Sequence, residues 1–187
     1  IVAPLLAADP EAHHVIMPAV QPFAPSSDGP GPYLEGGDII CYQNHLFVGE
    51  SDIATNRAGT DWLIDYITPF GYQVHPMPMD GTILHLLGTM VLVAEGVLLL
   101  YRDELKEPLP APLADWDVIE LTEQEARAYA TVGVSLDDKR YVIPAGLGRV
   151  CDELVKRGVE PIEIAYDYVS YWGGCVSCST HAILRDP

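Results

Sequence analysis

Three short segments of this sequence carry residues that could do chemistry together. Residues 35–38 (Glu-Gly-Gly-Asp) set two acids around two glycines, and glycine lets the backbone approach a neighbour or a ligand closely. His85 lies in an apolar run, and Cys178 follows two glycines near the end of the sequence. An acid, a histidine and a cysteine are the parts of an activated cysteine nucleophile. Their spacing does not by itself show that they meet in space.

Each segment also has a plainer interpretation. Residues 35–38 fit a solvated turn, and a single His85 among leucines fits a core histidine. Cys175 and Cys178 form a Cys-x-x-Cys pair, which in other proteins is redox-active or binds zinc. A redox-active pair of the thioredoxin type opens a helix, whereas β-like residues follow Cys178, which argues against a redox role. A zinc site would need a second cysteine pair or a spaced histidine pair, and the sequence has neither. The sequence therefore predicts no metal site and no cofactor.

The composition indicates a folded, strongly acidic protein. The 187 residues are 49% apolar and 20% charged, which is ordinary for a globular protein. Their number predicts a single domain over residues 1–187, with a Pro-rich lead-in at 1–33. Acidic residues number 27 against 10 basic ones, a formal charge of −17. A chain this acidic is a poor partner for nucleic acids or anionic membrane surfaces. Its acidity either keeps a solvated surface soluble or, in part, steers a cationic substrate.

Cysteine content and hydropathy suggest the compartment. Four cysteines are too few for a disulfide framework, no signal peptide is visible, and no apolar run reaches the roughly 18 residues of a membrane span. We therefore expect a reducing, cytoplasmic setting. Because the sequence starts with Ile rather than Met, we also expect a fragment, a processed chain or one piece of a split protein.

Hydrophobic periodicity predicts three ββαβ units that would position these residues. Their closing strands begin near residues 72, 117 and 161, a spacing of about 45 residues that is typical of repeats arranged radially or in a stack. A further strand is expected at residues 14–20. The expected hairpins are at 38–42 with 46–50, 90–94 with 97–101, and 132–136 with 140–143; helices follow the first and third, with a weakly helical, Pro-rich stretch after the second.

Six motifs, in this order, resemble the guanidine-modifying (pentein) superfamily. Its members include dimethylarginine dimethylaminohydrolase, arginine deiminase and glycine amidinotransferase, and the Val-Ser-Cys ending is most similar to the first of these. The match covers about residues 33 to 185. The motifs are Glu-Gly-Gly-Asp-Ile-Ile from Glu35, Leu-Phe-Val-Gly-Glu-Ser from Leu46, Thr55-Asn56 with Gly59, Leu-His-Leu around His85, Val-Ile-Pro-Ala-Gly from Val142, and Gly-Gly-x-Val-Ser-Cys up to Cys178.

The resemblance implies a fold of the α/β class. The superfamily is a five-bladed α/β propeller of ββαβ modules around a polar channel, and the three units expected here agree with part of it. The sequence looks like the C-terminal three-fifths of such a propeller. The further modules of the superfamily carry a Phe-x-Arg-Asp type segment that helps bind the guanidinium, and this segment is not found. We therefore expect the N-terminal remainder of the propeller elsewhere on the same chain or on another.

The resemblance also implies roles for individual residues. By matching motifs, Cys178 takes the nucleophile position, His85 the general acid/base position and Glu35 that of the acid orienting the histidine. Asp38 and Gly37 fall at substrate-binding positions. Cys175 has no matching catalytic role and is expected to be a packing residue. Relatives place Asp or Lys two residues after the histidine, where this sequence has Leu87, so the resemblance does not identify the substrate.

The implied activity is hydrolysis at the guanidino carbon of an arginine-like substrate, through a covalent amidino-thioether intermediate. Amidino transfer to an amine would use the same cysteine, histidine and glutamate and is a second hypothesis. A third is a non-enzymatic propeller that keeps the motif but has lost substrate contacts through Leu87. The expected partner of the two enzymes is a cationic guanidino small molecule, whereas the non-enzymatic propeller would bind either a small molecule or another partner.

Overall fold

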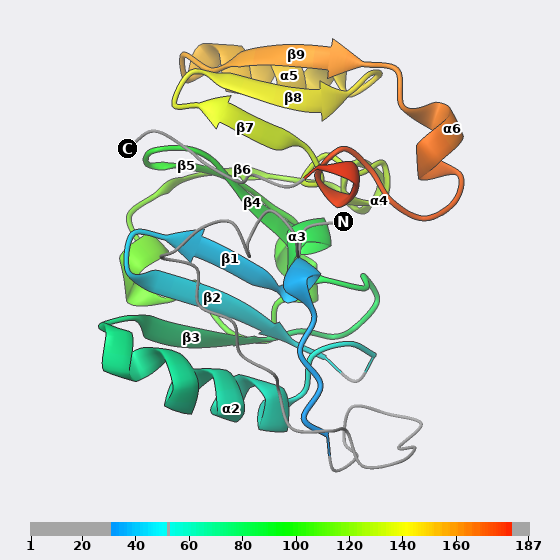
Figure 1. Ribbon diagram of the computed structural model, residues 1–187. Helices are drawn as coiled ribbons and strands as arrows, with labels where there is room; N and C mark the ends of the chain where they lie inside the picture. Colours follow the sequence, from blue (N-terminus) through cyan, green and yellow to red (C-terminus); the bar gives the residue numbers. More distant parts are fainter. Residues whose placement is uncertain (1–30, 52, 181–187) are drawn as a thin grey trace, which may run out of the picture.

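Three small sheets follow one another along the chain. In the computed structural model, which describes residues 31–51 and 53–180, each sheet has three strands in the order β1-β2-β3, β4-β5-β6 and β7-β8-β9 (Figure 1). In each, the first strand is antiparallel to the second and the second is parallel to the third. This arrangement needs a hairpin followed by a crossover, which is a ββ-crossover-β unit.

The first unit positions the Glu-Gly-Gly-Asp segment. A 3-10 turn leads directly into β1, and the helix in the crossover begins where the Asn56 side chain accepts the backbone N–H of Gly59 at 3.0 Å. The helix packs Leu63 onto the strand residues Leu46 and Val48. The elements are η1 (Gly36–Asp38), β1 (Ile39–Tyr42), β2 (His45–Glu50), α2 (Arg57–Ile67), η2 (Thr68–Phe70) and β3 (Gln73–Pro78).

The second unit differs from the other two in its crossover. Between its last two strands the chain forms two 3-10 turns and no α-helix, which agrees with the Pro-rich composition there, because proline removes the backbone donor that a continuing helix needs. A short helix carrying His85 at its N-cap precedes the unit. The elements are α3 (Leu86–Thr89), β4 (Met90–Ala94), β5 (Val97–Leu100), η3 (Arg102–Glu104), η4 (Ala111–Leu113) and β6 (Asp117–Glu120).

The third unit leads into the segment that carries Cys178. Before it, a short helix begins with a capping box between Thr122 and Glu125. After the last strand the chain forms another short helix and a final 3-10 turn. The elements are α4 (Glu123–Arg127), β7 (Val134–Asp137), β8 (Arg140–Pro144), α5 (Gly148–Lys156), β9 (Glu160–Ile164), α6 (Asp167–Ser170) and η5 (Ser177–Ser179).

The strands of the three predicted ββαβ units are confirmed, with ends shifted by one or two residues, but the second unit has two 3-10 turns where the pattern expects a helix. The predicted strand at 14–20 and most of the lead-in at 1–33 lie outside the described residues. Within the described part of the chain, no helix is both long and apolar enough to cross a membrane.

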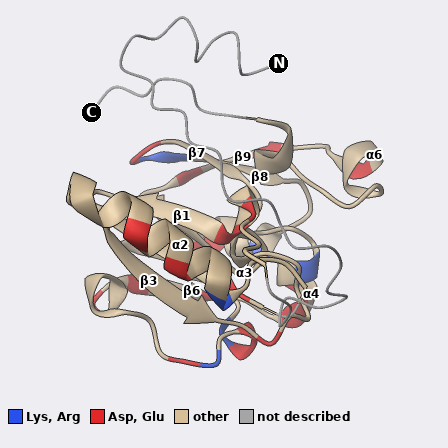
Figure 2. Cartoon of the chain, turned by 60° about the horizontal axis from the view of Figure 1, so that its bottom comes forward, with Lys and Arg blue, Asp and Glu red and all other residues tan. Residues whose placement is uncertain are grey.

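Acidic residues lie on several elements, α2 among them (Figure 2). Most described Lys and Arg residues pair with a carboxylate, and the remaining carboxylates leave a surplus of negative charge.

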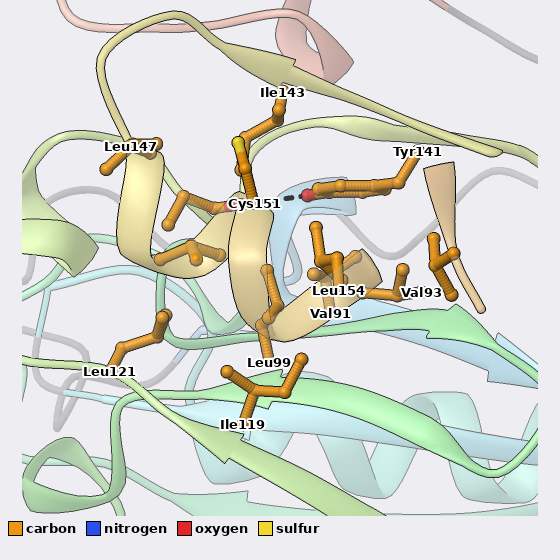
Figure 3. Packing of buried hydrophobic residues seen from close by; sticks show 13 residues of the cluster. Val91, Val93, Leu99, Ile119, Leu121, Tyr141, Ile143, Leu147, Cys151 and Leu154 are labelled. Atoms are coloured by element: carbon orange, nitrogen blue, oxygen red, sulfur yellow. Dashed lines mark hydrogen bonds between the residues drawn. The ribbon is translucent and has the colours of Figure 1, made fainter. Parts of the chain in front are cut away.

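Buried apolar clusters join the sheets. One cluster lies between the first and second sheets and contains Phe47, Met79, Leu86 and Leu98. Another joins the second sheet, the third sheet and α5 (Figure 3), and its largest member is Tyr141. The Tyr141 ring is fully buried, and its hydroxyl accepts the backbone N–H of Gly133 and donates to the Ala130 carbonyl, both at 3.0 Å. Burial raises the pKa of this hydroxyl well above its usual range.

Tyr141→Phe tests this packing. The substitution leaves the N–H of Gly133 and the carbonyl of Ala130 buried without a partner, so we expect a loss of about 1–3 kcal/mol in the free energy of unfolding. Tyr168→Phe is the matched control, because Tyr168 is 93% exposed. Urea unfolding followed by circular dichroism measures both. Equal stability of the two variants would contradict a structural role for the buried hydroxyl.

Candidate active site

Three segments far apart in the sequence meet at one cavity. Gly37 follows Glu35 in the turn before β1, His85 is the N-cap of α3, and Cys178 lies in η5. All of Gly37, His85 and Cys178 line a cavity of about 370 Å³. The predicted histidine and cysteine therefore line the same cavity, and the predicted acid Glu35 reaches it through its contact with His85, although the three come from different parts of the fold.

His85 and Glu35 contact each other directly. The Nε2 atom of His85 lies 2.6 Å from a carboxylate oxygen of Glu35, and both side chains keep part of their surface exposed. Glu35 is held by the backbone around it: its N–H donates to the Thr55 hydroxyl at 3.0 Å, and its carbonyl accepts the N–H of Asp38 at 3.1 Å. A carboxylate in this position fixes the ring orientation of the histidine.

Gly37 has a steric role beside His85. A Cβ atom added at residue 37 would lie 2.6 Å from Cγ and from Nδ1 of the His85 ring. Real Cβ atoms do not come this close to another heavy atom, so the ring can occupy this place only because residue 37 has no side chain. Gly36, its neighbour, has open space around the same position. Gly37 also lines the cavity, where it was expected to contact substrate.

Asp38 was expected near the substrate, and its carboxylate instead faces the protein interior. The residue is 1% exposed, and its two oxygens accept the backbone N–H of Leu86 at 2.9 Å and of Thr55 at 3.2 Å. Burial raises the pKa of this carboxyl group, and the hydrogen bonds from Thr55 and Leu86 oppose that rise. Asp38 thus ties the first unit to the residue that follows His85.

The segment around Cys178 is anchored by its neighbours. Cys175 is fully buried and packs with Val132 and Val176, as expected for a packing residue, and burial raises the pKa of its thiol. The N–H of Ser177 donates to the Val132 carbonyl at 3.1 Å. Cys178 itself is exposed, with a free thiol. The two cysteines of the Cys-x-x-Cys pair therefore occupy different environments, one in the core and one at the cavity.

Leu87 lines two neighbouring cavities. With Gly37, His85 and Cys178 it lines both the 370 Å³ cavity and a second one of about 780 Å³. An aliphatic side chain stands where an acid or a lysine was expected from the resemblance. Among the described residues, no group of three or more His, Cys, Asp or Glu side chains is arranged to hold a metal ion.

The sequence analysis missed two residues on the cavity wall. Tyr129 lines the 370 Å³ cavity with a φ of 64°, a left-handed backbone conformation that is uncommon outside glycine. Arg127 lines the same cavity and pairs with Glu123 at 2.8 Å. The capping box at residue 122 predicts a helix here, but no sequence signal indicates that its end faces Cys178.

Gly37→Ala and Gly36→Ala form a matched pair that tests the site geometry. The methyl group at residue 37 should push the His85 ring away, so that Nε2 and the Glu35 carboxylate separate beyond about 3.5 Å, where no hydrogen bond remains. The methyl group at residue 36 should leave the contact intact. Crystal structures of the two variants measure the distance directly. An unchanged contact in Gly37→Ala would show that the ring position does not depend on this glycine.

Comparison with known proteins confirms the resemblance. No family model matches the chain. The chain is 27% identical over 168 residues to N(G),N(G)-dimethylarginine dimethylaminohydrolase from Pseudomonas aeruginosa, an alignment that covers 88% of this chain and 63% of that enzyme. It is also 28% identical over 153 residues to the uncharacterised protein YkgA of Bacillus subtilis, with 81% of this chain and 52% of that protein covered.

Solved structures share the fold. An amidinotransferase of the saxitoxin biosynthetic pathway from Microseira wollei superposes with a TM-score of 0.71 at 20% identity, over 81% of this chain and 47% of that one. A dimethylarginine dimethylaminohydrolase adduct gives a TM-score of 0.66 at 25% identity, over 80% and 57%. This chain thus spans about half the length of these relatives. Its described part has the mixed α/β fold of enzymes that modify guanidino groups.

Proposed function

We propose that this chain carries the catalytic cysteine, histidine and glutamate of an enzyme acting on the guanidino carbon of an arginine-like substrate. The observation that carries the proposal is the contact between His85 and Glu35 beside the cavity that Cys178 also lines. These residues come from separate parts of the fold, and the resemblance to guanidine-modifying enzymes implies a catalytic role for each. Similarity to a dimethylarginine dimethylaminohydrolase supports the same class of chemistry.

In the proposed reaction Cys178 and His85 act in both half-reactions, and Glu35 orients His85. The Cys178 thiolate attacks the guanidino carbon and forms an S–C bond, while the C–N bond to the departing amine breaks. Protonated His85, oriented by Glu35, gives its proton to that amine. This leaves an amidino group on the sulfur. Neutral His85 then takes a proton from water, whose oxygen attacks the same carbon, and the S–C bond breaks to restore the thiolate and the protonated histidine.

Hydrolysis and amidino transfer differ only in the second half-reaction. If an amine takes the place of the water, the amidino group passes to that amine and the same three residues suffice. The similar proteins include both a dimethylarginine dimethylaminohydrolase and an amidinotransferase. We propose hydrolysis first, because the sequence relative with a named activity is a hydrolase, and keep transfer as the alternative.

Leu87 bears on how the substrate is held. Its side chain, together with Ile83 and Leu84, makes an apolar wall beside His85 and offers no countercharge to a guanidinium. We propose that the acid binding the guanidinium comes from further modules of the propeller, on this chain or on another. Tyr168, Tyr171 and Trp172 are each more than 80% exposed just before the Cys178 segment, which agrees with an apolar surface that another module covers.

A non-enzymatic role is the competing proposal, and Leu87 is the observation that favours it. A binding propeller could keep the contact between Glu35 and His85 for structural reasons while an apolar wall excludes the guanidinium. Such a protein would form no covalent intermediate. Trapping of Cys178 therefore separates the two.

Mass spectrometry of the protein after incubation with guanidines tests the proposed function. Incubation with arginine, methylated arginines and other guanidines, followed by rapid acid quenching, should reveal an amidino group on Cys178 for at least one compound. Cys178→Ser should carry no adduct and show no turnover, with its fold unchanged because residue 178 is exposed. Wild-type turnover by purified Cys178→Ser would refute the nucleophile assignment.

His85→Ala and Glu35→Gln test the proton transfers. Loss of a general acid–base group typically lowers the rate by about 10²- to 10⁴-fold, and we expect this range for His85→Ala. Glu35→Gln should lower kcat less, because the amide can still hydrogen-bond the ring and orient it but carries no negative charge beside an imidazolium in the transition state. Steady-state kinetics with the compound that labels Cys178 give both values. A kcat within about threefold of wild type for His85→Ala would contradict its role.

A further inference from the structure

The loop that carries His85 has few backbone partners of its own. It runs from the end of β3 to the start of α3, and Thr82, Ile83, Leu84 and His85 line the 370 Å³ cavity along it. Side chains in a loop are held in place only as well as the loop itself is. The backbone N–H groups of this loop therefore need partners from elsewhere if His85 is to keep one position.

Glu104 supplies partners on one side of the loop. It ends η3 in the second unit, and it is 1% exposed. One carboxylate oxygen accepts the N–H of Thr82 at 2.8 Å and that of Ile83 at 3.2 Å, and the other accepts the Thr82 hydroxyl. Three donors therefore hydrogen-bond to this buried carboxylate. A hydrogen bond to a charged group is stronger than one between two neutral groups.

The backbone around Glu104 continues the connection. The N–H of Asp80 donates to the Glu104 carbonyl at 3.0 Å, and the N–H of Lys106 donates to the Pro78 carbonyl at 2.9 Å. Met79 and Leu105 form an antiparallel bridge between these bonds. Residues 104–106 thus pair with residues 78–80, so the side chain of Glu104 approaches the loop from a fixed backbone.

Asp38 holds the other side of the same loop. Its buried carboxylate accepts the N–H of Leu86, the residue after His85. His85 therefore lies between two backbone segments, each bonded to a carboxylate that is 1% exposed: Glu104 from the second unit and Asp38 from the first. The position of the loop is fixed from both units at once.

We propose that Glu104 is a positioning residue for the site: together with Asp38 it clamps the loop at residues 82–86, so that the His85 ring stays in contact with Glu35 beside Cys178. Glu104 does not line the cavity and touches no reacting atom, so it acts through the loop. The consequence for catalysis rests on the proposed function, whereas the clamp itself is a statement about the His85 ring. A displacement of about 1 Å at a catalytic group can cost 10²-fold in rate, so loosening this loop should matter.

Nitrogen NMR of the His85 ring tests the clamp in three variants. Glu104→Met keeps the volume but leaves both loop N–H groups without an acceptor. Glu104→Gln keeps an acceptor oxygen, and its amide can donate to the Thr82 hydroxyl. Asp103→Asn is the matched control, because Asp103 is an exposed acid in the same turn. The ¹⁵N shifts of both ring nitrogens, read through the carbon-bound ring protons, report the hydrogen bond to Glu35.

The expected pattern is a wild-type ¹⁵N signature in Asp103→Asn, a signature close to it in Glu104→Gln, and in Glu104→Met a shift toward that of a histidine free in solution. If Glu104→Met does not fold, Glu104→Asp, which withdraws the carboxylate by one methylene, should show a smaller shift in the same direction. A merely structural role would lower the thermal unfolding temperature and leave the His85 shifts unchanged, and that result overturns the proposal.

The proposed function is judged separately from the clamp. Absence of any Cys178 adduct in the wild-type protein would refute the enzymatic proposal without changing the expected NMR pattern. If the adduct does form, Glu104→Met should form it at least tenfold more slowly than Asp103→Asn. Equal adduct rates in these two variants would show that the loop position does not control the chemistry.

Discussion

The site depends on one contact, between the Nε2 atom of His85 and the carboxylate of Glu35 at 2.6 Å. Two conditions make it possible. Residue 37 must have no Cβ atom, because the imidazole ring occupies the place where that atom would be. The turn before β1 and the loop before α3 must also be held at a fixed separation, and the buried carboxylate of Asp38 bridges them through the N–H of Leu86. The chemistry proposed for Cys178 needs a histidine held in this way.

The rest of the fold brings these segments together and keeps them rigid. An apolar cluster joins the first two sheets and includes Leu86, the residue next to His85. A second cluster joins the last two sheets, and a small one around Cys175 fixes the segment that ends at Cys178. Each of the three site residues lies in a turn or at a helix end. The buried strands therefore supply stability, whereas the short connections carry the candidate function.

Much of this arrangement could be predicted from the sequence. Alternating apolar residues and turn signals indicated the order of the units, and the motifs pointed to Glu35, His85 and Cys178. The inward orientation of Asp38 could not be predicted, because it depends on donors 17 and 48 residues away. Glu104 gave no signal either, since its partners lie 21 and 22 residues earlier in the loop before α3, and an isolated acid in a sequence usually indicates solvent exposure. Closure of the units into a five-bladed ring stays a prediction.

The most direct test of the account compares two reagents on two thiols of the wild-type protein, with the further modules of the propeller present, at neutral pH. A cationic haloacetamidine and a neutral haloacetamide are applied in parallel, and peptide mapping gives the alkylation rate at Cys178 and at Cys41, which is also exposed. The overall charge of −17 attracts the cation to both thiols, so Cys41 corrects for it. The account predicts a preference for the cationic reagent at least tenfold greater at Cys178 than at Cys41. Equal preferences at the two thiols would contradict a guanidinium-binding site at Cys178.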